Sequence, residues 1–250
     1  MEIYIQAASA GRGLSWITEA LSFFTRNPLG WIGAIIIIFI ITMFIGLIPF
    51  GTFALNIFYP VIVGGYMLGC KAHHQGGSFE LQHVFSGFKE PYFTRLVLVG
   101  VIYTVASLIA LILFGIMAFV TLGGFELFHQ LEQGQMGDIA QHQQDFIVLT
   151  LVAVALFTPF LMAMWFAPVI IISSDISPMS ALILSFKACL TNIIPFTVYG
   201  VVVLILLIIA AIPLMLGYLV LLPVLTASVY IAYLDCFKID STNDPTQLLP

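Results

Sequence analysis

The chain has 250 residues, of which 61% are hydrophobic and only 8% are charged, and its mean hydropathy is +1.13. Soluble domains carry about 25% charged residues, so this composition excludes a soluble globular protein. Seven basic and twelve acidic residues give a formal charge of −5, and no basic cluster could neutralise a row of phosphates. We therefore expect no nucleic acid among its partners.

The apolar residues gather in runs long enough to cross a hydrocarbon core of about 30 Å, which takes about 20 helical residues. The predicted spans are 31–50, 52–70, 96–122, 146–172, 193–212 and 218–237. Unbroken apolar runs favour helices over barrel strands, which alternate in segments of about ten residues. The sequence therefore predicts an all-α, polytopic membrane bundle of six transmembrane helices, with residues 1–250 as a single membrane domain.

The basic residues indicate the orientation of these spans. All seven fall on one side of the predicted membrane: Arg12, Arg26, Lys71, Lys89, Arg95, Lys187 and Lys238. Lys and Arg near span ends are retained on the cytoplasmic side. The connection 123–145 on the opposite side contains acidic residues and no Lys or Arg. We therefore expect a bacterial inner-membrane protein with cytoplasmic termini, a cytoplasmic tail over 238–250 and an acidic outer loop over 123–145.

An amphipathic stretch precedes each predicted hairpin, at 14–26, 79–88 and 178–189, with Ser78 and Ser177 as N-caps of the last two. A helix with one apolar and one polar face is typical of a membrane interface. The apolar faces expected for the second and third stretches comprise Leu81, Val84, Phe85 and Phe88, and Met179, Leu182, Ile183, Phe186 and Cys189. We therefore predict three parallel units, over 14–70, 78–172 and 177–237, each an interfacial helix followed by a hairpin.

Small residues recur at matching positions in two of these hairpins. Gly65 and Gly69 follow Pro60 at the offsets at which Ser228 and Ala232 follow Pro223. Small residues four apart let helix backbones approach closely, within one chain or between two protomers, so the oligomeric state stays open. In the same spans, Asn56 is the best candidate for a hydrogen bond between helices. Alternatively, it lines a weakly polar path with residues such as Thr104 and Thr226.

Within the predicted spans Asp235 is the one charged residue, and it lies near the cytoplasmic end. Ion-coupled transporters and intramembrane enzymes generally need ionisable groups inside the bilayer. The sequence also lacks the usual hydrolase, metalloprotease and nucleotide-binding motifs. His73, His74 and His83 share one connection with Glu80 and Glu90, but their spacing does not define a metal site. We therefore expect a non-enzymatic protein without catalytic, cofactor-binding or metal-binding residues.

Four charged residues lie at predicted cytoplasmic span ends: Arg95, Asp175, Lys187 and Asp235. One interpretation is that they form ion pairs that hold the hairpins together on that side. The other is that this rim and the amphipathic helices form a docking surface for a protein partner or for lipid headgroups.

Several motifs resemble those of an uncharacterised family of proteobacterial inner-membrane proteins. They comprise Gly11-Arg12-Gly13 with Trp16, Leu68 to Lys71, Ser86 to Phe88, Met164 to Pro168, Asp175, Pro178, Ser185 to Cys189 and Asn192 to Phe196. More distantly, the pattern of an amphipathic helix before a hairpin is similar to YciC-like proteins and to the membrane domain beside some glycerophosphodiester phosphodiesterases. The resemblance implies a helical inner-membrane protein without an assigned activity.

These observations favour a non-enzymatic membrane protein that binds a partner or organises other components. The alternative is a channel, flippase or carrier for a neutral or amphiphilic molecule, which a polar cavity between the hairpins would support. A less favoured third role is a surface receptor or immunity factor.

Overall fold

The computed structural model describes residues 2–125, 132 and 143–240. Most of the predicted outer loop and all but three residues of the predicted tail lie outside this part of the chain. The elements, in chain order, are β1 Glu2–Ile5, α1 Arg12–Arg26, α2 Pro28–Gly46, α3 Gly51–His74, η1 Leu81–Phe88, α4 Phe93–Thr121, α6 Gln143–Ser173, α7 Pro178–Thr191, α8 Ile193–Ala211, α9 Tyr218–Cys236 and β2 Phe237–Asp240.

Six of the described helices, α2, α3, α4, α6, α8 and α9, are long and apolar enough to cross a membrane. The prediction of an all-α polytopic membrane protein is therefore confirmed. The helix ends differ from the predicted ones by a few residues; α2, for example, begins at Pro28 rather than at Trp31. Asn27 causes this earlier start, because its side chain accepts a hydrogen bond from the Gly30 N–H and Pro28 occupies the first helical turn.

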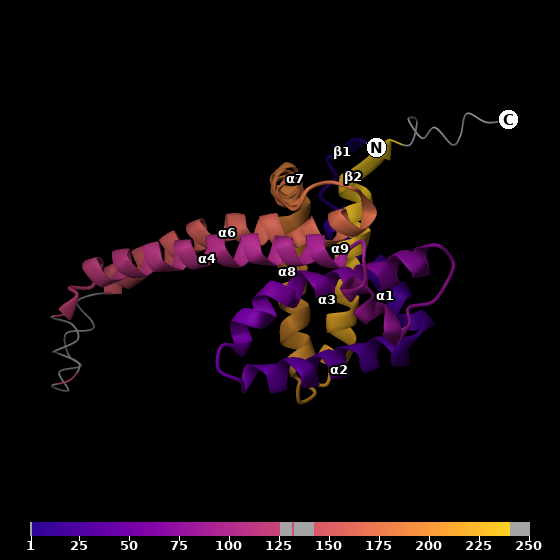
Figure 1. Ribbon diagram of the computed structural model, residues 1–250, viewed down its shortest axis with the longest axis horizontal. Helices are drawn as coiled ribbons and strands as arrows, with labels where there is room; N and C mark the ends of the chain where they lie inside the picture. The colour runs from indigo at the N-terminus through magenta and orange to yellow at the C-terminus, as the bar shows by residue number, and fades with distance from the viewer. Residues whose placement is uncertain (1, 126–131, 133–142, 241–250) are drawn as a thin grey trace.

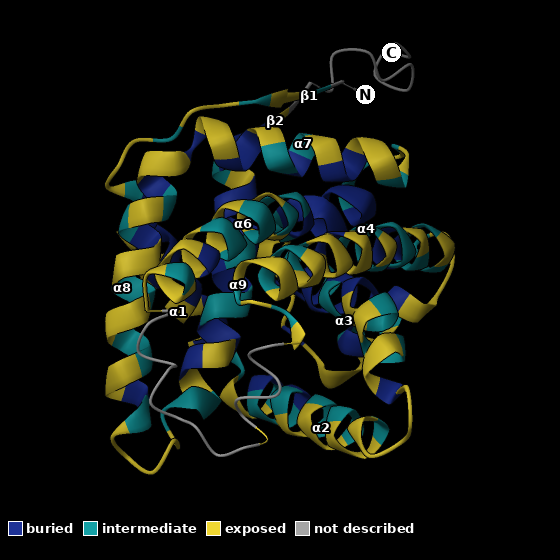
Figure 2. Ribbon diagram, turned by 90° about the vertical axis from the view of Figure 1, so that its left-hand side faces the viewer, coloured by how far each residue is buried: buried dark blue, intermediate teal, exposed yellow. Residues whose placement is uncertain are grey.

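The three hairpins meet at one junction; the tips of α2–α3 and α4–α6 point to the same side, and the tip of α8–α9 points in another direction (Figure 1). α4 and α6 run side by side as a long arm, whereas α8 and α9 run across that direction. The buried residues concentrate where the hairpins, α1 and α7 meet, and Figure 2 shows exposed residues along the projecting helices. The helices that project from the junction expose apolar side chains, which makes their surfaces suited to a lipid environment.

α1 buries its apolar face against the protein. Trp16, Ala20 and Phe23 are buried where α1 packs on α8 and α9, whereas Leu14 and Leu21 stay 49% and 46% exposed. The amphipathic pattern therefore identifies a real helix, but most of the predicted apolar face covers other helices instead of lying against the membrane interface.

The second predicted amphipathic helix differs from expectation. It is a 3₁₀ helix, η1, that starts after Glu80 instead of after Ser78, because the Glu80 N–H donates to His83 Nδ1 at 2.9 Å. Val84 and Gly87 are buried against α3, whereas Phe85 and two further apolar residues of the expected face are exposed, namely Leu81 and Phe88. Helical-wheel spacing does not describe η1, because a 3₁₀ helix repeats every three residues.

α7 begins as predicted, with Ser177 as its N-cap and Pro178 in its first turn. Its contact face is only partly the predicted one, because Leu182 and Cys189 are buried as expected and the other predicted residues are not. Its buried residues are Ala181, Leu182, Ser185, Ala188 and Cys189, whereas Met179 and Ile183 are about half exposed. The Ser185 hydroxyl donates to the Met162 carbonyl and accepts from the Phe166 N–H at 2.7 and 2.9 Å. The small side chains on this face let α7 lie close enough to α6 for the Ser185 hydroxyl to form these hydrogen bonds with the α6 backbone.

The two ends of the described chain are paired, which the sequence did not predict. β1 and β2 form an antiparallel pair in which Ile5 lies opposite Phe237. The fully buried Asn192 secures the segment after β1: it accepts from the Ala8 N–H at 2.7 Å and donates to the Gln6 carbonyl at 3.0 Å. The strand pairing places both ends of this part of the chain at the junction (Figure 1).

Candidate functional site

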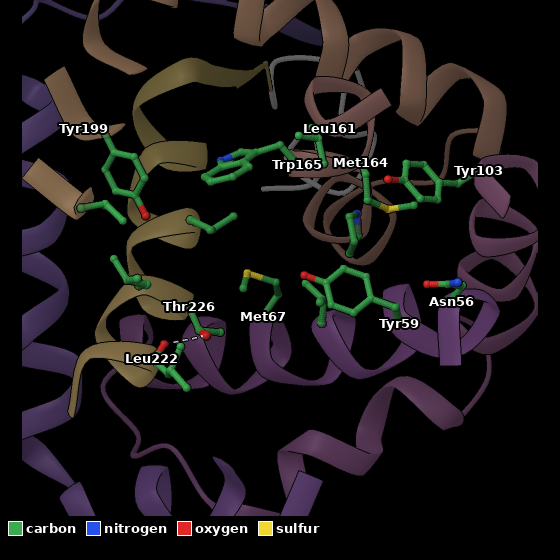
Figure 3. Close-up of a pocket in the computed structure, with 15 residues that line it drawn as sticks. Asn56, Tyr59, Met67, Tyr103, Leu161, Met164, Trp165, Tyr199, Leu222 and Thr226 are labelled. Atoms are coloured by element: carbon green, nitrogen blue, oxygen red, sulfur yellow. Dashed lines mark hydrogen bonds between the residues drawn. The ribbon is translucent and has the colours of Figure 1, made fainter. Parts of the chain in front are cut away.

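A cavity of about 520 Å³ lies between the hairpins, with walls from α3, α4, α6, α8 and α9. Of the 15 residues that line it, nine are wholly apolar and none is charged. The remaining six carry a polar atom: Asn56, Tyr59, Tyr103, Trp165, Tyr199 and Thr226. Figure 3 shows these side chains around one shared space. The site is therefore largely apolar with a few hydrogen-bonding groups, as small-molecule sites usually are.

The cavity is closed on one side and open on another. Met67, Met164 and Tyr199 are almost fully buried, at 1%, 7% and 6% exposure. Tyr59 and Leu161, by contrast, are 55% and 59% exposed. Because these exposed residues belong to α3 and α6, which are long enough to span a membrane, the opening lies along the spans.

Proline and tyrosine positions shape the wall of this cavity. Pro168 cannot donate a backbone hydrogen bond to the Met164 carbonyl, and both residues line the space. On the facing wall, the Tyr199 hydroxyl is 2.8 Å from Ser228 Oγ, which joins α8 to α9. Thr226 donates to the Leu222 carbonyl of its own helix at 2.9 Å, so its hydroxyl is already used as a donor.

The other four polar side chains of the lining, Asn56, Tyr59, Tyr103 and Trp165, form no hydrogen bond with the described residues. Asn56 forms no hydrogen bond to another helix in the part of the chain that the structure describes, contrary to the role expected for it. It lines the cavity instead, as does Thr226. The Trp165 Nε1 atom is buried and has no acceptor among the described residues. No local pattern marks Trp165 and Tyr199 as lining residues, since only the tertiary structure brings their rings, from α6 and α8, together.

The small residues predicted to mediate helix packing lie at contacts within this chain. A Cβ atom added at Gly65 would lie 2.1 Å from the Val84 carbonyl oxygen of η1. One added at Gly69 would lie 2.4 Å from the Phe79 ring. Ser228 and Ala232 are buried on α9. Gly65 and Gly69 therefore allow close contact with the segment that contains η1, and their faces are not contacts with another span or with a second protomer.

The four predicted rim charges are only partly brought together. Arg95 pairs with Asp175 at 2.8 Å and also donates to the Ser174 carbonyl. Lys187 is exposed and forms no ion pair within the described residues. Of the four residues, only Arg95 and Asp175 pair with each other in the described part of the chain, so the expected set of ion pairs is found in part.

The partner of Asp235 is Arg12, a pairing that the sequence did not predict. Arg12 Nε and Trp16 Nε1 both donate to Asp235 Oδ2, at 2.5 and 2.7 Å. Arg12 also pairs with Glu19. Hydrogen bonds to Asp235 and then to Glu19 raise the Arg12 pKa above its ordinary value. Since α1 carries Arg12 and α9 carries Asp235, this pair fastens the N-terminal helix to the end of the last span.

Two of the described histidines serve in capping and packing, and the three cysteines are buried and form no disulfide bond. His83 caps η1, and the side chain of His73 packs on Phe23 with ring centroids 4.1 Å apart. Among the residues that the structure describes, no three His, Cys, Asp or Glu side chains gather in a way that could hold a metal ion.

The chain is similar to a probable inner membrane protein of Burkholderia thailandensis. The two are 30% identical over 200 residues, which cover 77% of this chain and 72% of the relative. No family model and no solved structure matches, so the wider resemblance to YciC-like proteins and phosphodiesterase membrane domains stays a prediction. With this identity, this coverage and six helices long enough to span a membrane, the chain belongs to the same family of inner membrane proteins as the Burkholderia protein.

Proposed function

We propose that this protein is a non-enzymatic inner-membrane carrier that binds an amphiphilic molecule in the cavity between its hairpins. The observation that carries the proposal is the cavity of about 520 Å³, which opens along the spans. Ligand sites usually have volumes of about 300–1,000 Å³ and combine apolar walls with a few polar groups. The lining combines nine apolar residues with the six polar ones named above, so it suits a molecule with an apolar and a polar part.

The shape of the site favours a carrier over a channel. A channel needs a continuous wet path, whereas Met67 and Met164 close this cavity with apolar side chains. The opening beside Tyr59 and Leu161 instead lets a ligand enter from the lipid. A ligand that enters from the lipid does not need charged residues along its path, which agrees with the scarcity of charge in the spans.

The proposal is tested by filling the cavity. Val203 of α8 lines it, whereas Val201 of the same helix is 55% exposed and does not. We expect the full-length protein, purified in mild detergent, to retain an amphiphile that native mass spectrometry detects. V203F should lower the retained amount severalfold, because the larger ring occupies the site, and the matched variant V201F should not. Equal retention by both variants, or no retained amphiphile, would contradict the proposal.

A partner-binding or organising role is a second candidate, supported by the outward face of α7. Met179, Ile183 and Leu190 are 50%, 47% and 48% exposed there, next to the unpaired Lys187. A photoreactive residue at position 183 should capture a specific protein in cells if this face binds one. The same residue at position 201, on a span, is the control. Capture of lipid alone at both positions would remove this candidate.

A further inference from the structure

We infer that the α8–α9 hairpin lies along the plane of the membrane, inside its cytoplasmic leaflet, with α1 between the hairpin and the cytoplasm. The partner of this surface is lipid: hydrocarbon surrounds the hairpin and its tip, and headgroups meet the outer face of α1. α8 and α9 are long enough to cross a membrane. Three features favour an in-plane position instead: the direction of the hairpin, the polar face of α1 and the apolar tip.

The α4–α6 arm and the α8–α9 hairpin cannot both stand upright in one membrane, because the hairpin runs across the arm (Figure 1). The arm fits the upright position better. α4 has 29 residues and α6 has 31, or about 43–46 Å, which matches a bilayer of about 40–45 Å with its headgroups. One end of the arm carries the Arg95–Asp175 pair, and the other leads into the acidic connection 123–145. An upright arm places α8–α9 along the membrane plane.

α1 accompanies the hairpin from its base to its tip. Arg12 pairs with Asp235 at the base, whereas Leu21 lines a groove of about 370 Å³ together with Pro213 and Gly217 of the tip. Figure 1 shows the arm and α1 on opposite sides of this hairpin. Since the arm extends toward the predicted outer side, α1 lies on the cytoplasmic side of the hairpin.

The outer face of α1 is polar along this contact. Glu19, Ser22 and Arg26 follow one another at spacings of three and four residues, which places them on one face of the helix, and all three are exposed. Beside an upright hairpin this face would lie in hydrocarbon, where charged side chains are costly. On the cytoplasmic side of an in-plane hairpin, the same face meets headgroups and water, as in other interfacial helices.

The tip of the hairpin is apolar and uncovered. Ile212, Leu214 and Leu216 are 76%, 90% and 63% exposed, and no charged residue occurs between Lys187 and Asp235. A tip at the outer membrane surface would present these side chains to water, which is unfavourable in proportion to their apolar area. A tip inside the leaflet has hydrocarbon on every side, which agrees with its composition.

The first test measures membrane depth along two helices. Nitroxide labels are attached singly to exposed positions at equal spacing on α8 and on the control helix α4, namely V201C, I208C and I212C, and L98C, V105C and I109C. The full-length protein is placed in vesicles of phosphatidylethanolamine and phosphatidylglycerol, and collisions with oxygen and with a nickel chelate give the depth of each label. We expect depth to change by about 16 Å along α4 and by less than about 5 Å along α8. Equal changes along both helices would overturn the inference.

The second test locates α1 and the tip with a membrane-impermeant maleimide. S22C, on the polar face of α1, should react in inside-out membrane vesicles and not in right-side-out ones, whereas I212C should react in neither. The wild type gives the background, because its three cysteines are buried. Reaction of I212C from the outer side, or protection of S22C on the cytoplasmic side, would overturn the inference. The proposed carrier does not depend on either result.

Discussion

Three polar side chains at the junction each join segments that are distant in the sequence. Asn27 donates to the Phe79 carbonyl at 2.7 Å, Asn192 binds the segment after β1, and Asp235 accepts from Arg12 and Trp16. Asn27 and Asn192 stand at equivalent places, each between a short helix and the span that follows it. Asn192 is fully buried, so its amide satisfies backbone groups that would otherwise be left unpaired away from water.

D235N tests the contribution of the Arg12 pair to stability. The amide still accepts a hydrogen bond but loses the charge, so the free energy of unfolding should fall by about 1–3 kcal/mol. The Arg12 pKa is raised in the folded state, so charged Arg12 contributes its full stability at any pH below its pKa in the unfolded chain. That stability is lost only when the pH rises through the still higher pKa of the folded state. The difference between D235N and wild type should therefore stay constant from pH 7 to pH 10, measured by denaturant unfolding in detergent.

D175N is the matched control for this prediction. Asp175 also pairs with an arginine, but its side chain is fully exposed, so water screens the interaction. D175N should leave the unfolding midpoint unchanged. A larger effect for D175N than for D235N would show that burial does not determine which rim pair matters.

At the scale of elements, η1 and α3 interlock through two glycines. Added Cβ atoms would lie 2.1 Å from a carbonyl oxygen in each case: Gly65 from Val84, and Gly87 from Val61. Both contacts are with backbone, which cannot move aside as a flexible side chain does. The close approach holds η1 over the middle of α3, where Pro60 and Val61 are also buried.

G65A should therefore destabilise the fold by about 2 kcal/mol or more, because a methyl group forces η1 away from α3. Gly33 of α2 is the control, since no atom lies within 4 Å of the Cβ that G33A would add. That variant should change the free energy of unfolding by less than about 1 kcal/mol, in the stabilising direction expected of alanine in a helix. Thermal unfolding of both variants in the same detergent checks the pair.

Helix faces were harder to predict than the helices themselves. On α7, Leu182 and Cys189 of the predicted face are buried, whereas Met179, Ile183 and Phe186 are not. The small residues Ala181, Ser185 and Ala188 are buried instead, and Ser185 bonds to the backbone of α6. In water, large apolar side chains turn inward. Beside lipid they gain little by doing so, and small residues that allow close approach form the protein contacts instead. The same reasoning explains why Leu14 and Leu21 of α1 are exposed.

At the scale of the whole molecule, the strand pairing and the charge pattern together predict the orientation. β1 pairs with β2, so both ends of the described chain lie together, and the topology predicted from the sequence assigns every basic residue to that side of the spans. A fluorescent protein fused after Pro250 should therefore fluoresce in the cytoplasm, and alkaline phosphatase at the same place should be inactive. Alkaline phosphatase inserted in the 123–145 connection should be active. Reversed activities would mean that the termini face outward.

By itself, the sequence determined the six helices of membrane-spanning length, their order and the N-cap of α7, because length, apolarity and capping are local properties of the chain. It also named Asn56 and Thr226, which line the cavity, since polar residues stand out in an apolar helix. Only the tertiary structure decided that Trp165 and Tyr199 share that cavity, that Arg12 pairs with Asp235 and that β1 pairs with β2. These contacts join residues up to 238 positions apart, and such pairings depend on how the hairpins pack at their junction, which no local pattern records.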